Sequence, residues 1–317
     1  MNSLSGIRLG FFGTPDFALE VLKALCKDSA EIKFVVTQSP RPSGRGQKEN
    51  FSKVHQWTNS REIKTFTTDK TNNFFYETFI KKIEVDFIVV VAYGQIIDES
   101  ILKHPKFMSL NVHASLLPRW RGAAPIQRAI LNGDSKTGIS IMRVDQKLDS
   151  GPVIIKKELK INKSDNAGTL HSKLESIGAE LIKESIKKIY SNDFKLHFQN
   201  EDDTTYAKKI DKSETRINWK KSAQYNERFI RAFNPWPGAW SIMHTEREFR
   251  VKILDSEIIK YKKLFPKTLE EGVCDENLIV KCGDGFLKIR KIQKEGKKIM
   301  NADEFINGYK IKTCFLK

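Results

Sequence analysis

The stretch that decides the fold runs from Leu110 to Gln127 and reads LNVHASLLPRWRGAAPIQ. Its first residues are typical of a buried strand. Asn111 and His113 stand two positions apart in that strand, so both side chains should emerge on the same face. A turn follows, and a helix is expected to begin near Ala123 to Pro125. The pattern therefore aims two polar side chains at one place beside a strand end.

The segments around this stretch alternate between strand and helix patterns. Short apolar runs at Ile7 to Phe12 and Ile32 to Thr37 flank a helical repeat over Phe17 to Leu25. The run DFIVVVAY, Asp86 to Tyr93, is typical of a central strand that is buried on both faces. A long amphipathic helix is expected over Thr169 to Tyr190. We therefore predict an α/β fold with a doubly wound, mostly parallel, Rossmann-like sheet.

Beyond residue 191 the composition becomes polar and loses helical periodicity. Short alternating apolar runs recur from Trp240 onward, and Gly283 to Gly285 between two of them indicates a hairpin turn. We predict a smaller, OB-like β-barrel. The expected organisation is a first domain over residues 1–191, a linker over 192–212 and the barrel over 213–317.

Several classes of protein are not supported by the sequence. The longest apolar run, Phe87 to Tyr93, is far shorter than the roughly 20 residues that span a bilayer. We expect no membrane segment, no signal peptide and a cytoplasmic location. Gly13 belongs to neither a dinucleotide fingerprint nor a phosphate loop of the Walker type. The four cysteines form no C-x-x-C pair, so we expect reduced structural thiols and no metal site.

The formal net charge of +16 favours a polyanionic partner such as nucleic acid. A general bias toward lysine in the composition would explain the charge equally well. Residues 38–50, QSPRPSGRGQKEN, are expected to form a basic loop without regular structure, because Pro and Gly recur in them. Such a loop could contact phosphate or could be a solvated connection.

The residue types at the strand end suggest acyl transfer without a Ser or Cys nucleophile. Asn111 can donate to a developing oxyanion, and His113 can donate or move a proton. Asp149, in a turn between two expected strands, can orient the imidazole. A substrate amine would then be the nucleophile. The residues alone leave open the more common situation, in which such polar side chains merely satisfy one another.

Six motifs, in chain order, make the sequence resemble the methionyl-tRNA formyltransferases, which belong to the 10-formyltetrahydrofolate-dependent formyltransferases. They are GTPDFA at 13–18, RPSGRG at 41–46, VVVAYG at 89–94, NVHASLLPRWRGAAPIQ at 111–127, LDSG at 148–151 and RAFNPWPG at 231–238. The chain departs from the usual pattern after Gln38, where Ser and Pro replace Pro and Asp, and at Ala114, where Gly is common.

The resemblance implies an enzyme of translation initiation and one-carbon metabolism that formylates initiator methionyl-tRNA. It implies that Asn111, His113 and Asp149 are catalytic and that Ser115, Leu116, Leu117 and Pro118 bind the formyl donor, 10-formyltetrahydrofolate. We expect a monomer without a metal. Basic residues that could line a path for the tRNA are Arg41, Arg45, Lys48, Arg119, Arg121, Lys208 and Lys209.

Two other functions remain open at this point. One is a formyltransferase that acts on a small amine, and the other is a non-catalytic RNA-binding relative. Phe233, Trp236 and Trp240 could stack on bases, but a small barrel also needs an aromatic core.

Overall fold

The structure is a computed structural model that describes the chain except for residues 1–2, 44–47, 261–269, 310 and 312–313. The chain divides into two compact units. The first comprises Met1–Pro125, Lys136–Lys160 and His171–Lys208, and the second comprises Ile126–Ser135, Ile161–Leu170 and Lys209–Lys317. Among the described helices, none combines the length and the apolar character that a membrane crossing requires.

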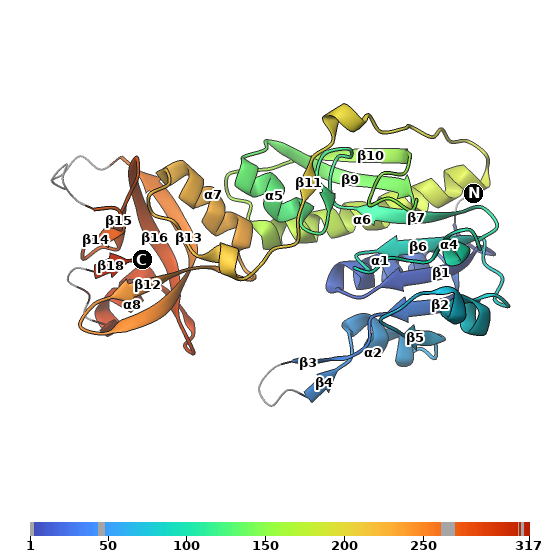
Figure 1. The fold of residues 1–317 in the computed structure, drawn as a ribbon, viewed down its shortest axis with the longest axis horizontal. Coiled ribbons are helices and arrows are strands. Elements are labelled where there is room, and N and C mark those ends of the chain that lie inside the picture. Colours follow the sequence, from blue (N-terminus) through green and yellow to red (C-terminus); the bar gives the residue numbers. More distant parts are fainter. Residues whose placement is uncertain (1–2, 44–47, 261–269, 310, 312–313) are drawn as a thin grey trace. The chain divides into compact units, whose positions relative to one another are not determined.

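The first unit is built on a seven-stranded sheet (Figure 1). Strands β7, β6, β1, β2 and β5 are parallel to their neighbours, whereas β9 and β10 run antiparallel at one edge. The mostly parallel sheet that the sequence predicts is thereby confirmed. Its order is β10 (Val153–Lys160), β9 (Lys136–Arg143), β7 (Met108–His113), β6 (Phe87–Val91), β1 (Arg8–Gly13), β2 (Glu31–Thr37) and β5 (Thr65–Thr67).

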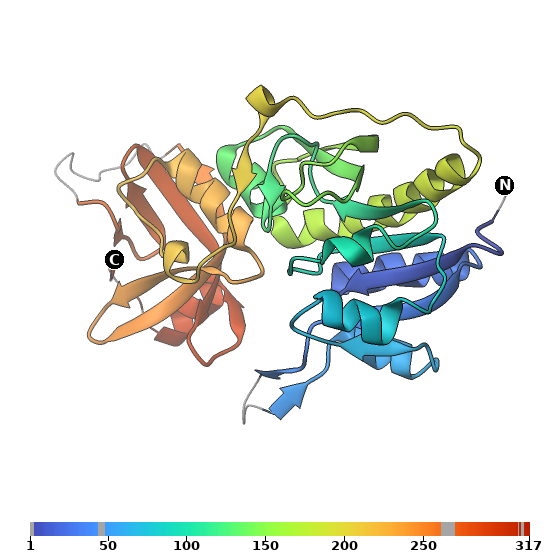
Figure 2. The same cartoon turned by 45° about the vertical axis from the view of Figure 1, so that its right-hand side comes forward.

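Helices cover both faces of this sheet, as the two views in Figure 1 and Figure 2 show. On one face lie α1 (Asp16–Lys27) and α6 (Ala167–Tyr190), where the Phe17 and His171 rings are 5.3 Å apart. Gly178 of α6 approaches Val112 so closely that a Cβ would lie 2.9 Å from it. Three short helical segments border the apolar cluster on the other face: α3 (Asn73–Phe75), the π-helix η1 (Tyr76–Ile80) and α4 (Glu99–Leu102). Helix α2 (Lys53–Asn59) follows a two-stranded ribbon.

The polar segment after α6 packs onto the first unit. His197 forms a bridge with Val153, the 3-10 turn η2 (Glu201–Asp203) follows, and β11 (Tyr206–Ala207) pairs in parallel with β8 (Arg121–Gly122). Residues 192–208 are therefore part of the first unit. The boundaries at 191 and 212 stay a prediction.

The second unit contains the expected β-barrel, which closes through pairing of β13 with β16. The ring runs β13 (Glu248–Ile259), β12 (Ala239–His244), β18 (Cys314–Leu316), β14 (Val273–Cys274), β15 (Ile279–Cys282) and β16 (Gly285–Lys294), and β17 (Ile299–Asn301) extends it. The hairpin at residues 283–284 joins β15 to β16 as expected. The remaining elements are α5 (Pro125–Asn132), η3 (Ser213–Thr215), α7 (Ala223–Phe233) and α8 (Ala302–Tyr309).

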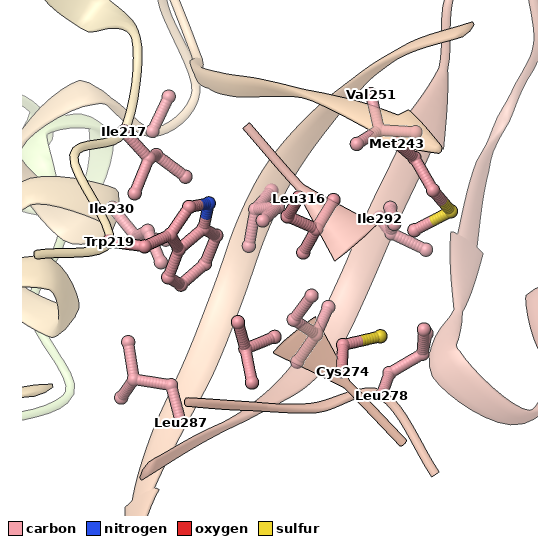
Figure 3. Close-up of a cluster of buried hydrophobic side chains, with 14 of the residues drawn as sticks. Ile217, Trp219, Ile230, Met243, Val251, Cys274, Leu278, Leu287, Ile292 and Leu316 are labelled. Carbon is pink, nitrogen blue, oxygen red and sulfur yellow. The ribbon is translucent and has the colours of Figure 1, made fainter. Parts of the chain in front are cut away.

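The barrel encloses an apolar core to which α7 contributes (Figure 3). Phe229, Ile230 and Phe233 of α7 join Trp219 and residues of the barrel strands in this cluster. The indole Nε1 of Trp219 donates to Ser241 Oγ at 3.1 Å, which satisfies a polar atom that burial would otherwise leave costly. Phe233 therefore belongs to the core and is not available for stacking on a base.

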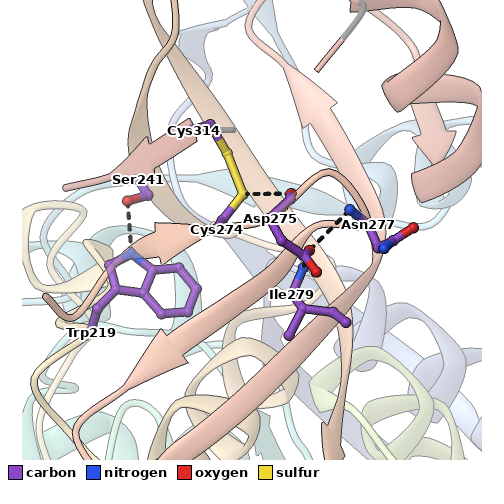
Figure 4. The surroundings of a disulfide bond; sticks show 7 residues. All are labelled: Trp219, Ser241, Cys274, Asp275, Asn277, Ile279 and Cys314. Atoms are coloured by element: carbon purple, nitrogen blue, oxygen red, sulfur yellow. Dashed lines mark hydrogen bonds between the residues drawn. A yellow bond between two sulfur atoms is a disulfide. The ribbon is translucent and has the colours of Figure 1, made fainter. Parts of the chain in front are cut away.

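Two of the four cysteines correct an expectation. Cys274 and Cys314 form a disulfide, with their Cα atoms 5.2 Å apart (Figure 4). The two residues are direct partners on neighbouring antiparallel strands, β14 and β18. The expectation of four reduced thiols is therefore wrong for this pair and holds for Cys26 and Cys282. Burial raises the pKa of the Cys282 thiol to about 11.

Candidate active site at the end of strand β7

Strand β7 presents Asn111 and His113 on the face of the sheet that carries the apolar cluster of β1, β2 and β6. Asn111 is the Cα partner of Val90, which belongs to that cluster, and paired residues share a face. Val112 points to the opposite face, toward α6. The alternation of a strand thus separates the two polar side chains from the packing residue between them.

The structure brings Asp149 to the same point. Asn111 Nδ2 donates to Asp149 Oδ1 at 3.2 Å, and His113 Nδ1 lies 3.5 Å from Asp149 Oδ2. The side chains of His113 and Asp149 are only 6% and 13% exposed. One carboxylate therefore contacts both strand residues in a largely dehydrated place, where electrostatic interactions are strong.

The surroundings of His113 fix its orientation. Its Nε2 lies 2.9 Å from the carbonyl oxygen of Trp120, and because a carbonyl can only accept, we assign a hydrogen to Nε2. Nδ1 then faces Asp149. A proton that arrives at Nδ1 gives an imidazolium that donates to both neighbours. The pair can therefore take up and release a proton without moving either ring or carboxylate.

Asp149 is held in an unusual backbone conformation. Its φ of +47° lies in the left-handed region, which is costly for a residue with a side chain. Its Oδ2 accepts a hydrogen bond from the backbone N–H of Gly122 at 2.8 Å. Gly122 has φ +119°, and a Cβ there would lie 2.8 Å from the carbonyl oxygen of Ala207. Because Gly122 has no side chain, the chain can lie close to Ala207, and the backbone N–H of Gly122 is then placed to donate to the carboxylate of Asp149.

The turn predicted to bind the formyl donor is packed against β9 and β10. Ser115 and Leu117 are buried, and Ser140 Oγ accepts from Leu117 N at 3.1 Å and donates to Ser115 O at 2.7 Å. Lys156 Nζ donates to the carbonyl of Leu117, and burial lowers the pKa of this lysine. Leu116 and Pro118 are half-buried. The donor-binding role of Ser115 to Pro118 stays a prediction.

A hollow of about 610 Å³ lies in the same unit, which the sequence did not indicate. Its walls come from the end of α4, the start of β7 and the segment between β9 and Asp149. Phe107 and Met108 are apolar parts of the wall, and Arg143 and Lys147 add positive charge. Its volume falls in the range of ordinary small-molecule sites.

The basic loop after β2 contains a short antiparallel ribbon, which corrects the expectation of a loop without regular structure. Strands β3 (Arg41–Ser43) and β4 (Lys48–Asn50) pair with Arg41 opposite Asn50. The side chain of Arg41 is exposed. Arg45 and the side chain of Lys48 lie outside the described residues.

The other basic candidates differ in their surroundings. Arg119 places its guanidinium 4.6 Å from the centre of the Trp120 ring, and Lys208 and Lys209 are exposed. Arg121 has a position that we did not expect for a tRNA contact, because its side chain is only 2% exposed. Its NH1 and NH2 donate to the two carboxylate oxygens of Glu201 at 3.1 and 2.8 Å. These hydrogen bonds raise the pKa of Arg121 and lower that of Glu201.

The second unit has a hollow of its own, of about 370 Å³. Trp236 lies at its wall and is 63% exposed. Lys212, Arg250 and Lys252 also line it, together with Gln293 and Glu295. An exposed aromatic ring beside cations is a combination that suits nucleic-acid bases and phosphates.

Comparisons with known proteins place this geometry in a family. The sequence pattern of the formyl transferase family matches residues 7–186, and that of the formyl transferase C-terminal domain matches residues 209–310. The methionyl-tRNA formyltransferase of Bartonella henselae is 40% identical over 311 residues, covering 98% of this chain and 99% of that protein. The corresponding proteins of Caulobacter vibrioides and Legionella pneumophila are 39% and 36% identical, each covering 97% of this chain and 98% and 97% of their own lengths.

Solved structures share the fold at lower identity. The N-formyltransferase from Helicobacter canadensis, crystallised with folinic acid and dTDP-3-aminofucose, superposes with a TM-score of 0.62 at 22% identity, covering 91% of this chain and 99% of its own. HypX from Aquifex aeolicus with tetrahydrofolic acid gives 0.62 at 15% identity, and the match covers 97% of this chain and 48% of HypX. The family patterns and the near-complete match to its relatives show that this chain belongs to the methionyl-tRNA formyltransferases of the formyl transferase family.

Proposed function

We propose that this protein transfers the formyl group of 10-formyltetrahydrofolate to the α-amine of initiator methionyl-tRNA, which yields N-formylmethionyl-tRNA for translation initiation. The observation that carries the proposal is the meeting of Asn111, His113 and Asp149 at the end of β7. The full-length similarity to methionyl-tRNA formyltransferases supports the choice of substrate.

The three residues have separate tasks in this reaction. When the amine attacks the formyl carbon, the carbonyl oxygen gains negative charge, and the second N–H of the Asn111 amide can donate to it. Protonated His113 adds positive charge nearby. Asp149 faces His113 Nδ1 and stabilises the charge of the imidazolium. It can also relay the proton that the amine loses toward the leaving nitrogen of the folate. The tetrahedral intermediate then collapses to the formamide and tetrahydrofolate.

The formyl donor is proposed to bind at the turn of Ser115, Leu116, Leu117 and Pro118, which directly follows His113 at the carboxyl end of β7. The resemblance of this turn to the folate-binding segment of the family supports the placement. The 610 Å³ hollow is lined by Met108 and Ser109 at the opposite, amino-terminal end of β7, and Asp149 is not part of its lining, so we assign it no role in the reaction. No step of it uses a metal.

The acceptor is proposed to be recognised through basic residues. Arg41, Arg45, Lys48, Arg119, Lys208 and Lys209 are proposed to contact tRNA phosphates, which position the acceptor arm without reading sequence. The basic hollow with Trp236 adds a place for a stacked base. Arg121 is assigned a supporting role in the site because its charge is paired with Glu201. We propose that the protein works as a monomer in the cytoplasm.

One assay tests the proposal against its nearest rival, a formyltransferase for a small amine. Release of tetrahydrofolate from 10-formyltetrahydrofolate is measured with charged initiator tRNA, with charged elongator tRNA and with an amino sugar nucleotide. We expect release with initiator tRNA and a KM that rises steeply with salt. Release with the sugar alone would overturn the choice of acceptor, and no release with any of the three would overturn the activity.

A further inference from the structure

The catalytic aspartate is held by a side chain that lies 50 residues further along the chain. Gln199 Nε2 donates to the carbonyl oxygen of Asp149 at 2.8 Å and to that of Gly151 at 2.7 Å. One amide group thus closes the two ends of the turn in which Asp149 sits. Both hydrogens of that amide are used.

The turn needs such a tie. Asp149 has the left-handed φ of +47°, and Gly151 passes so close to β9 that a Cβ would lie 2.0 Å from Arg143 O. A strained backbone persists only where its surroundings hold it. The Gln199 amide donates to two carbonyl oxygens of the turn, which would otherwise need water or another donor as a partner.

The orientation of the Gln199 amide is itself determined. Its Oε1 accepts from Arg121 Nε at 3.1 Å, so the NH2 group must face the turn. Arg121 is fixed in place by both oxygens of Glu201 and is nearly inaccessible. Its chain neighbour Gly122 donates to Asp149 Oδ2. Asp149 is therefore held by two direct contacts: Gln199 donates to its backbone carbonyl and Gly122 donates to its carboxylate. Arg121, next to Gly122, fixes the orientation of the Gln199 amide.

The segment that contains Gln199 also hydrogen-bonds to the backbone of Trp120 and Arg121, the part of the chain that contacts His113. Thr205 Oγ1 accepts from Trp120 N at 2.9 Å, and Thr205 O accepts from Arg121 N at 2.9 Å. Trp120 in turn provides the carbonyl to His113 Nε2. Residues 197–207 therefore contact the supports of both members of the His113–Asp149 pair.

We propose that Gln199 is a positioning residue for formyl transfer, which acts by holding the Asp149 turn so that the carboxylate faces His113 and Asn111. It does not touch the reacting atoms. The inference rests on the proposed function for its kinetic test, and a second measurement on the turn itself is independent of activity.

The test variant is Gln199→Glu, which keeps the size of the side chain and its acceptor for Arg121 Nε. It replaces the donor to the two carbonyls with an oxygen. We expect the single-turnover rate of formyl transfer to fall about 10- to 100-fold, since small displacements of a catalytic group have effects of this size. KM for methionyl-tRNA and for the folate should change little. Gln199→Leu, which removes both interactions, should lose at least as much.

Gln56→Glu is the matched control. Gln56 Nε2 also donates to a backbone carbonyl, that of Phe51, at 2.9 Å, but it lies on α2 away from the site. This variant should keep the wild-type rate. The thermal midpoint of each variant shows how much of any loss comes from unfolding.

A double-mutant cycle separates positioning from a general structural role. If Gln199 acts through Asp149, adding Gln199→Glu to Asp149→Asn should lower the residual rate little further. A full additional loss in the double variant would overturn the proposal, as would a wild-type rate in Gln199→Glu.

Amide hydrogen exchange provides the reading that does not depend on activity. In Gln199→Glu the segment 145–152 should exchange faster than in the wild type, whereas the Gln56→Glu protein should not differ there. Unchanged exchange in this segment would overturn the proposal even if the wild-type protein formylated a different acceptor. Faster exchange in a protein that formylates no acceptor would refute the proposed function, but the conclusion that Gln199 holds the Asp149 turn would remain valid.

Discussion

The site at the end of β7 and the hollow of the barrel unit both use polar side chains, but they hold them in opposite ways. In the first, Asp149 is bound by Asn111 and Gly122 and is 13% exposed. In the second, Trp236 is 63% exposed beside Lys212 and Lys252. Transfer of a proton and of an acyl group requires atoms fixed in position. Attraction of a polyanion requires charge that solvent and phosphate can reach. The predictions below test that difference.

Asp149→Asn should have the largest effect. The amide keeps the size of the side chain but removes the negative charge that supports protonated His113, so formyl transfer should slow by about 100- to 1000-fold. Stability should change little, because the carboxamide can still accept from Gly122 N. Single-turnover assays and thermal unfolding measure the two effects. The exposed carboxylate Asp202 gives the control Asp202→Asn, and a wild-type rate in the Asp149 variant would remove this residue from the catalytic set.

Breaking the disulfide should affect the barrel unit and spare the chemistry. Cys314→Ser, or reduction of the wild type, should lower the free energy of unfolding by about 2–4 kcal/mol, because the bond closes a loop between Cys274 and Cys314. The transfer rate below the unfolding transition should stay the same. Thiol titration in denaturant should find two free groups before reduction. Four would show that the disulfide does not form in solution.

Trp236→Ala should weaken acceptor binding only. Loss of one stacked base is worth about 1–3 kcal/mol, so KM for methionyl-tRNA should rise about 5-fold or more while KM for the folate stays constant. Phe74→Ala, at another exposed aromatic residue in the first unit, is the control. Equal changes in both KM values would show that the ring does not distinguish the two substrates.

Arg41→Ala should have a smaller effect of the same kind. Arg41 is exposed on β3, so its removal should leave stability unchanged. KM for the tRNA should rise a few-fold, and the salt dependence of log KM should become shallower by about one phosphate contact. A KM that changes equally for tRNA and folate would refute a tRNA role for this ribbon.

Glu201→Gln should change the response of stability to acid. Hydrogen bonds from Arg121 lower the pKa of Glu201 in the folded protein, so the folded state holds the proton less tightly than the unfolded chain. The stabilisation by this pair is therefore present above the ordinary glutamate pKa and disappears as pH falls through the lower, folded value. The thermal midpoints of the wild type and Glu201→Gln should differ by a constant amount above about pH 5 and converge below it. A constant difference down to pH 3 would contradict this account.

Local patterns predicted the frame of the molecule well. The alternation of strand and helix signals between Ile7 and Tyr190 indicated a mostly parallel sheet, and the repeat after Trp240 indicated a barrel; the structure has both. The spacing of Asn111 and His113 placed them on one face because a strand has a period of two. Asp149 was singled out by its residue type and the family resemblance, and no local rule required it to meet His113.

The sequence did not show the contacts of residues whose partners lie in distant segments. Arg121 was expected to help line a path for the tRNA, and in the structure its side chain is buried and paired with Glu201, 80 positions away. The disulfide joins residues separated by 40 positions, and only the pairing of β14 with β18 brings them together. Gln199 lies in a segment whose composition is that of a linker.

The sequence by itself determined the two folds, the strand end with its polar pair and the family. Each of these depends on interactions between residues that are close in sequence or on motifs that are contiguous. Tertiary structure alone decided that Asp149 faces His113, that Arg121 is buried and that Gln199 holds the catalytic turn. Those contacts depend on how strands, turns and the segment after α6 pack, and packing is set by the whole unit and not by any one stretch.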